Sequence, residues 1–72
     1  MQDNFPNYYK IIADNIKSLR VAQGLSQECF AEKIGCSREY VSRLENYHEQ
    51  ISLQMLLNIA KCFGKKPQSF FE

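Results

Sequence analysis

Glycine stops and serine starts divide this chain into short helical pieces. Gly24 and Gly35 each end a helical pattern, and Ser26 and Ser37 each follow two residues later. Glycine accepts the left-handed conformation that closes a helix, and a serine side chain caps the free N–H groups that open the next one. These signals predict helices over about residues 9–22, 27–34 and 37–46.

Two further helical pieces follow. Ser52 is the expected cap of a fourth helix that ends at Gly64, and Pro67 suits the first turn of a last short helix, "PQSFF". No segment alternates apolar and polar residues in the manner of a strand. In the first helix, apolar residues recur at the spacing that covers one helical face: Ile12, Ile16 and Leu19. The sequence therefore predicts an all-α fold of five helices in a single domain, residues 1–72.

Length and composition exclude several classes of protein. The chain has 72 residues, of which 44% are hydrophobic and 24% are charged, as in a small soluble globular domain. A core of this size contributes only roughly 3–5 kcal/mol, so a partner subunit would help to stabilise it. No stretch approaches the ~18 apolar residues of a membrane span, and the start, "MQDNFPNYYK", lacks the pattern of a signal peptide. We therefore expect a cytoplasmic protein.

The three cysteines do not suit a disulfide framework or a zinc site. Cys29, Cys36 and Cys62 form no C-x-x-C pair, and His48 is the only histidine. A cysteine nucleophile with His48 as its base would need a substrate cleft. A helical chain of this length has few residues with which to line one. We predict no metal, no cofactor and no catalytic residue, and hence a protein that is not an enzyme.

The third helix, "REYVSRLEN", carries more long polar side chains than its own packing requires. At about 100° per residue, Val41 and Leu44 point inward and polar residues gather on the opposite side. One interpretation is a solvated face on which Glu39 and Arg43 form an ion pair. The preceding helix and the turn "IGCS" favour another interpretation, because with this helix they match the helix-turn-helix arrangement.

The segment "LSQECFAEKIGCSREYVSRLEN", residues 25–46, resembles the helix-turn-helix of the Cro and lambda-repressor-like family, also called the XRE family. The matching elements are "LSQ", "AEKIG", the serine that opens the second helix, and "VSRLEN". The resemblance covers roughly residues 10–71 and places the helix-turn-helix at 26–46, after an N-terminal extension, 1–8. It implies a compact five-helix lambda-repressor-like DNA-binding domain of a transcriptional regulator, often dimeric.

The resemblance assigns roles to individual positions. The side chains at or beside base-reading positions are Arg38, Glu39, Tyr40, Ser42 and Arg43. The expected phosphate contacts are Ser26, Gln27, Ser37, Asn46 and Lys17. An arginine can bind O6 and N7 of guanine, a glutamate can accept from cytosine N4, and helix N-termini attract phosphate. The family also pairs an arginine with a glutamate at the places of Arg20 and Glu45, so we expect that structural ion pair.

The chain departs from the family after "EN". Family members often continue with a glycine and basic residues, whereas this loop reads "YHEQI". Tyr47 must therefore tolerate or alter the local backbone, and Glu49 adds a negative charge. The net charge of only +1 predicts modest non-specific affinity for DNA, because that affinity comes mainly from Lys and Arg.

The fourth helix is apolar on two sides. We expect its core stripe to be Leu53, Leu56, Leu57 and Ala60. A second strip, together with aromatic residues near the end of the chain, predicts a homodimer interface: Met55, Ile59, Cys62, Phe70 and Phe71. A two-fold dimer would bind a pseudo-palindromic operator with half-sites about 10–10.5 base pairs apart, or a multiple. Alternatively, the N-terminal aromatic segment "FPNYY", which we expect to cover the core rather than to read DNA, shields this strip.

Two functions from different classes remain. The first is a sequence-specific DNA-binding transcriptional regulator, either a repressor or a small controller protein, that reads the major groove of double-stranded DNA with helix 37–46. The alternative is a protein-interaction module of the same fold, such as an antitoxin-like partner-binding domain. The intact "LSQ" and "SREYVSRLEN" favour the first, and the low net charge favours the second. No small-molecule effector is evident.

Overall fold

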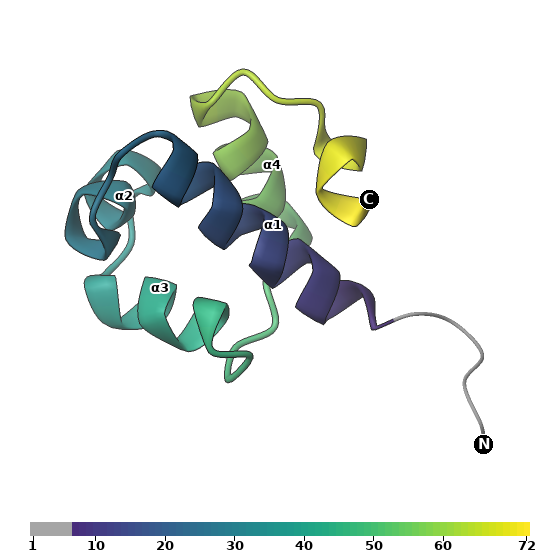
Figure 1. Cartoon of the computed structure of the whole chain (residues 1–72), viewed down its shortest axis with the longest axis horizontal. Coiled ribbons are helices and arrows are strands. Elements are labelled where there is room, and N and C mark those ends of the chain that lie inside the picture. The colour runs from purple at the N-terminus through teal and green to yellow at the C-terminus, as the bar shows by residue number, and fades with distance from the viewer. Residues whose placement is uncertain (1–6) are drawn as a thin grey trace.

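Four α-helices and one 3-10 helix make up the part of the chain that the computed structural model describes, residues 7–72. In Figure 1, α1 (Tyr8–Ala22) runs diagonally, with α2 (Gln27–Ile34) at one end, α3 (Arg38–Glu45) below, and α4 (Leu53–Cys62) and η1 (Pro67–Phe71) above. The all-α prediction is confirmed for this part, which has no strand and no helix suited to crossing a membrane. The prediction of five helices is corrected to four α-helices. The short segment after Pro67 closes as a 3-10 helix, the geometry typical of such short pieces.

Each α-helix begins with a side chain that accepts a hydrogen bond from the backbone N–H group three residues later. Ser26, Ser37 and Ser52 do so at 3.0, 3.1 and 3.1 Å, which confirms the predicted caps. Asn7 caps α1 in the same way, at 3.2 Å. The starts of the helices are thus set by local chemistry that the sequence displays.

All four α-helices end with the same pair of backbone hydrogen bonds, one spanning three residues and one spanning five. In each case a residue with positive φ closes the helix. This residue is a glycine after α1, α2 and α4, but it is Tyr47, with φ of 66°, after α3. A residue with a Cβ atom adopts this conformation only at a cost, so other contacts must hold Tyr47 in place.

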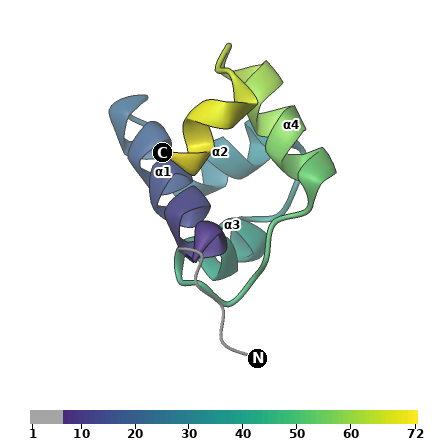
Figure 2. The same cartoon turned by 90° about the vertical axis from the view of Figure 1, so that its right-hand side faces the viewer.

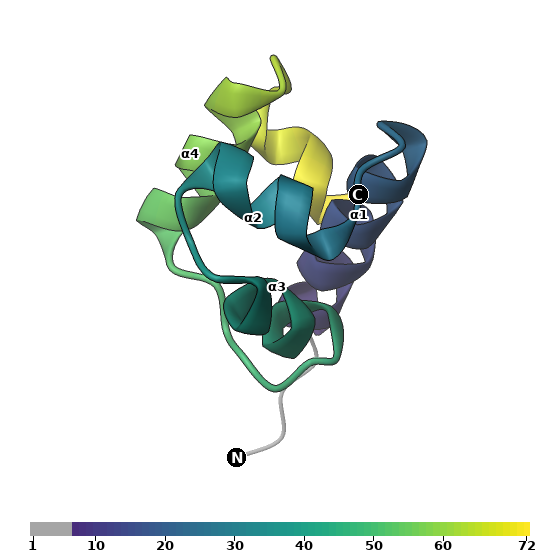
Figure 3. The ribbon, with the colours of Figure 1, turned by 90° about the vertical axis from the view of Figure 1, so that its left-hand side faces the viewer.

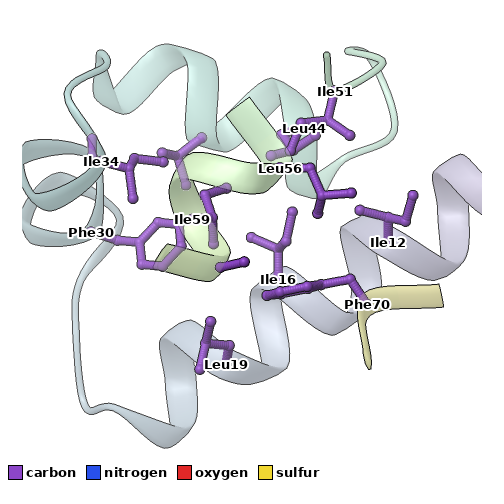
Figure 4. Packing of buried hydrophobic residues seen from close by; sticks show 13 residues of the cluster. Ile12, Ile16, Leu19, Phe30, Ile34, Leu44, Ile51, Leu56, Ile59 and Phe70 are labelled. Atoms are coloured by element: carbon purple, nitrogen blue, oxygen red, sulfur yellow. The ribbon is translucent and has the colours of Figure 1, made fainter. Parts of the chain in front are cut away.

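The helices are arranged around a common centre in the two end views of Figures 2 and 3, and each of them contributes buried side chains to the core. Figure 4 shows that side chains from α1, α2, α4 and η1 meet there: Ile16, Phe30, Ile59 and Phe70. Val41 and Leu44 attach α3 to the same cluster. The inner side of α3 is therefore fixed by packing.

The face of α4 that packs against the core differs from the predicted one. Leu56, Ile59 and Ala60 are buried, whereas Leu53 and Leu57, which we expected in the core, are 68% and 45% exposed. Ile59 has no exposed surface, so its predicted place in a dimer interface is wrong. The helix is apolar on both sides, and its packing against α2 and η1 decides which side is buried.

Phe70 is also buried and does not lie at a surface available to a second copy. Asn15 Nδ2 of α1 donates a hydrogen bond to the backbone carbonyl of Phe70 at 2.8 Å, which holds η1 against α1. Phe71 remains partly exposed, and its ring packs edge-on against Tyr8 with 5.9 Å between centroids. Tyr8 and Tyr9 are exposed, so they do not cover the core as predicted. The start of the "FPNYY" segment, residues 5 and 6, lies outside the described residues.

Candidate nucleic-acid interface

α3 turns one face into the protein and the opposite face to solvent. Val41 and Leu44 are buried, whereas Arg38, Glu39 and Arg43 are exposed. In Figure 3, α3 lies at the lower part of the helical body, beneath α2 and joined to it by a short turn. A helix held from behind by a preceding helix, with its polar face outward, is the helix-turn-helix arrangement.

Two of the predicted base-reading side chains are less exposed than the others. Tyr40 is half-buried against the core, and burial, with a smaller effect of the Glu49 charge, raises the pKa of its phenol. Ser42 is half-buried as well. Asn46 Nδ2 donates to the Ser42 carbonyl at 2.9 Å and approaches its hydroxyl oxygen at 3.4 Å. The side chain of Asn46 is thus bonded to its own helix in the free protein.

A buried carboxylate fastens α3 to both α1 and α2. Glu45 is 7% exposed, and its two oxygens accept hydrogen bonds from Arg20 Nε at 2.7 Å and Arg20 Nη2 at 3.1 Å. Gln27 Nε2 donates to the same carboxylate at 3.1 Å, and Arg20 Nη1 donates to the Leu25 carbonyl at 2.8 Å. The ion pair between Arg20 and Glu45 that the resemblance implied is therefore present, within a network that connects three helices.

The bond from Gln27 also places the first turn of α2 beside the last turn of α3. The amide of Gln27 has a second N–H group besides the one that bonds Glu45. Ser26 and Ser37 accept from backbone N–H groups, so each hydroxyl hydrogen is available to donate. The N-termini of α2 and α3 bear unpaired backbone N–H groups and the positive ends of the helix dipoles, both of which suit phosphate.

Both outward arginines of α3 are paired with carboxylates of the same chain. Arg38 Nη2 lies 3.5 Å from Glu39 Oε2, and Arg43 Nε lies 3.3 Å from Glu49 Oε1. The loop after α3 thus brings Glu49 to Arg43, where the alternative interpretation expected Glu39. Ion pairs that are this exposed contribute little to stability, so they do not by themselves explain why the charges are there.

Tyr47 ties the loop after α3 to α1. Its hydroxyl donates a hydrogen bond to the carboxylate of Asp14. Lys10 Nζ bonds the same carboxylate at 3.2 Å and stands over the Tyr47 ring, 5.1 Å from its centroid. Hydrogen bonds from Tyr47 and Lys10 lower the pKa of Asp14, and the bond to Asp14 raises the pKa of Tyr47. Sequence reasoning missed this cluster, because it joins residues 33 positions apart without a local pattern.

Lys17, the predicted phosphate contact on α1, lies on the side of the helix that carries this cluster. Its positive charge is near enough to lower the pKa of Asp14 slightly further. Lys10 thus contacts the loop that follows α3, and Lys17 lies near Asp14 on the same helix. At least one basic group of α1 therefore lies beside the residue that closes α3.

The chain matches known helix-turn-helix proteins over most of its length. The helix-turn-helix family HTH_3 matches residues 16–70. The control protein C.SmaI of Serratia marcescens is 35% identical over 60 residues, which are 83% of this chain and 71% of that protein. The propionyl-CoA carboxylase regulator of Cereibacter sphaeroides is 41% identical over 49 residues, which are 68% of this chain but only 11% of the regulator.

A solved structure agrees with these matches. The restriction-modification controller protein C.AhdI from Aeromonas hydrophila is similar with a TM-score of 0.79 at 32% identity, over 88% of this chain and 96% of that one. The family match, the helix-turn-helix and the network around Glu45 all support one assignment. This chain belongs to the HTH_3 family, the XRE-type helix-turn-helix proteins that are DNA-binding transcriptional regulators.

Proposed function

We propose that this protein recognises a specific DNA sequence by placing α3 in the major groove. The observation that carries this proposal is the way α3 is held. The network around Glu45 fixes its inner edge to α1 and α2, and Arg38, Glu39 and Arg43 stand on its outer side. A few side chains discriminate bases well only when a rigid scaffold presents them in a fixed orientation.

Each outward side chain of α3 has a chemical role in this proposal. Arg38 and Arg43 can each bind a guanine through O6 and N7, and Glu39 can accept from the N4 amino group of cytosine. Tyr40 and Ser42, on the flanks, can reach neighbouring bases. The groups proposed to contact phosphates lie on α1, at the starts of α2 and α3, and at the end of α3: Lys10, Lys17, Ser26, Gln27, Ser37 and Asn46.

The names of similar proteins support a regulatory role of a particular kind. C.SmaI is called a control protein, and C.AhdI is called a restriction-modification controller protein. We propose that this protein is likewise a controller or a repressor of transcription.

The proposed binding unit is a homodimer on a pseudo-palindromic operator, with an interface different from the one the sequence predicted. Leu53 and Leu57 lie one turn apart on α4 and are exposed. Leu53 and Phe71 line the same groove, of about 380 Å³, together with Tyr8 and Tyr9. Exposed apolar surface of this kind usually marks an interface, and we place the two-fold contact with a second copy there. Among the residues predicted earlier, Phe71 keeps its place in this surface.

Selection from a pool of random DNA duplexes tests the proposed function. Wild-type protein should enrich sequences that contain two related half-sites in inverted orientation. Retention of all sequences alike would contradict base reading by α3. That result would favour the alternative, a protein-interaction module. The net charge of +1, the carboxylate of Glu39 on α3 and that of Glu49 after it also favour this alternative.

A further inference from the structure

Glu49 occupies one edge of the guanidinium group of Arg43. The contact joins Glu49 Oε1 to Arg43 Nε at 3.3 Å. A guanidinium group offers one N–H at Nε and two at each terminal nitrogen, in a fixed plane. Within residues 7–72, neither Nη1 nor Nη2 of Arg43 makes a hydrogen bond. The carboxylate thus leaves available the end of the side chain that forms two parallel bonds.

The position of Glu49 relative to Arg43 is fixed by the backbone as well. The N–H group of His48, the residue before Glu49, donates to the carbonyl oxygen of Arg43 at 2.8 Å. Tyr47 turns the chain back with its positive φ, and its hydroxyl bonds Asp14 on α1. The loop is therefore attached both to α3 and to α1. The side chain of Glu49 is 35% exposed, compared with 50% for Arg43, so the carboxylate is the less exposed partner of the two.

These contacts have two consequences for DNA reading. An arginine that is already held loses less side-chain freedom when it binds, so more of the binding energy appears as preference for the correct base. A carboxylate beside the major groove also repels phosphates, which weakens binding to every sequence alike. The first consequence raises the ratio of specific to non-specific affinity, whereas the second lowers both affinities and leaves their ratio unchanged.

Resting on the proposed DNA-reading role of α3, we propose that Glu49 is a specificity-determining positioning residue. It holds Arg43 so that Nη1 and Nη2 meet the O6 and N7 atoms of a guanine. The negative charge that departs from the family pattern after "EN" therefore contributes selectivity, although it lowers affinity in general.

Base preference at single positions tests this role. The duplex that wild-type protein selects from a random pool is altered at one base pair at a time, and the position that Arg43→Ala relaxes identifies the base read by Arg43. Glu49→Ala should reduce the guanine preference there by about 3- to 10-fold, the effect of a typical net hydrogen bond. The same variant should bind a scrambled duplex more tightly, because a negative charge has been removed.

Three further variants separate positioning from charge. Glu49→Gln should keep more of the guanine preference than Glu49→Ala, because its amide oxygen can still accept from Nε. Glu32→Ala removes an exposed carboxylate from the last turn of α2 and should leave the preference unchanged. The double variant of Arg43→Ala with Glu49→Ala should show no greater loss of preference than Arg43→Ala alone.

The outcomes distinguish this inference from the proposed function. If wild-type protein selects a sequence and Glu49→Ala keeps the full guanine preference while binding all duplexes more tightly, Glu49 is only a repulsive charge and the inference is overturned. If wild-type protein prefers no base at any position, the proposed function fails together with the inference.

Discussion

Arg20 and Glu45 join α1 to the last turn of α3 through two hydrogen bonds, of 2.7 and 3.1 Å. Their side chains are 14% and 3% exposed, so this pair is shielded from water far more than the ion pairs of Arg38 and Arg43. Gln27 and the carbonyl of Leu25 complete the hydrogen bonding of the pair. The orientation of α3 and of its exposed face therefore depends on a contact on the inner side of the helix.

Removing one partner of this pair should destabilise the protein. Arg20→Leu leaves the Glu45 carboxylate buried without its cation, so we expect the free energy of unfolding to fall by about 3 kcal/mol. Arg20→Leu combined with Glu45→Leu should cost less than the sum of the two single variants, because no uncompensated charge remains. Urea denaturation measures all three. Strictly additive effects would show that the two groups do not interact.

Tyr47 should respond to substitution in an order set by its backbone and its hydroxyl. Tyr47→Ala keeps a Cβ at positive φ and loses the contacts with Asp14 and Lys10, so it should have the lowest melting temperature of the series. Tyr47→Gly removes the cost of positive φ, so its melting temperature should be higher than that of Tyr47→Ala. Tyr47→Phe keeps the ring, so its melting temperature should be closer to that of wild type. Thermal unfolding checks the order, with Tyr9→Phe as a matched exposed control. A Tyr47→Ala variant as stable as wild type would contradict a structural role for this residue.

The Asp14–Tyr47 contact predicts a dependence of stability on pH at both extremes. The pKa of Asp14 is lowered from its ordinary 3.8, so its contribution is present above that pH and is lost as the pH falls through the folded value. The pKa of Tyr47 is raised from its ordinary 10.0, so its contribution is present below that pH and is lost as the pH rises through the folded value. Tyr47→Phe should weaken both dependences in melting curves recorded across pH. Identical pH profiles for wild type and Tyr47→Phe would contradict this coupling.

The features that sequence predicted correctly are those with local causes. Ser26, Ser37 and Ser52 act on backbone groups three residues away, so a short stretch of sequence is enough to find them. The side of α4 that is buried could not be found in this way. Leu53 and Ile59 are both strongly apolar, and only the packing of other helices distinguishes them.

The same distinction between local and tertiary causes applies to the candidate site. The outward direction of Arg38 and Arg43 follows from helical periodicity. The bond between Arg43 and Glu49 depends on how the loop turns back after α3, and that turn places a tyrosine where a glycine is usual. The contact of that tyrosine with Asp14 requires the tertiary fold.

The proposed dimer surface predicts that the same substitution has different effects on the oligomeric state at two exposed apolar residues, Leu53 and Val21. Leu53→Asp, on α4, should shift the protein toward monomer in sedimentation at micromolar concentration, because it places a charge in the apolar groove. Val21→Asp, in the last turn of α1, introduces the same charge at a residue that is 60% exposed and lies outside that groove, and it should leave the mass unchanged. Wild-type protein that sediments as a monomer at all concentrations, or equal effects of the two variants, would contradict this interface.

The most direct test of base reading by α3 is the equilibrium affinity of wild type and Arg43→Ala for the selected duplex and for a scrambled duplex of the same composition. Loss of an arginine that binds guanine should weaken binding to the selected duplex by about 1–3 kcal/mol and relax the preference at one base position. Binding to the scrambled duplex should weaken much less, because most non-specific contacts remain. An equal loss of affinity for both duplexes would contradict the claim that Arg43 on α3 reads a base.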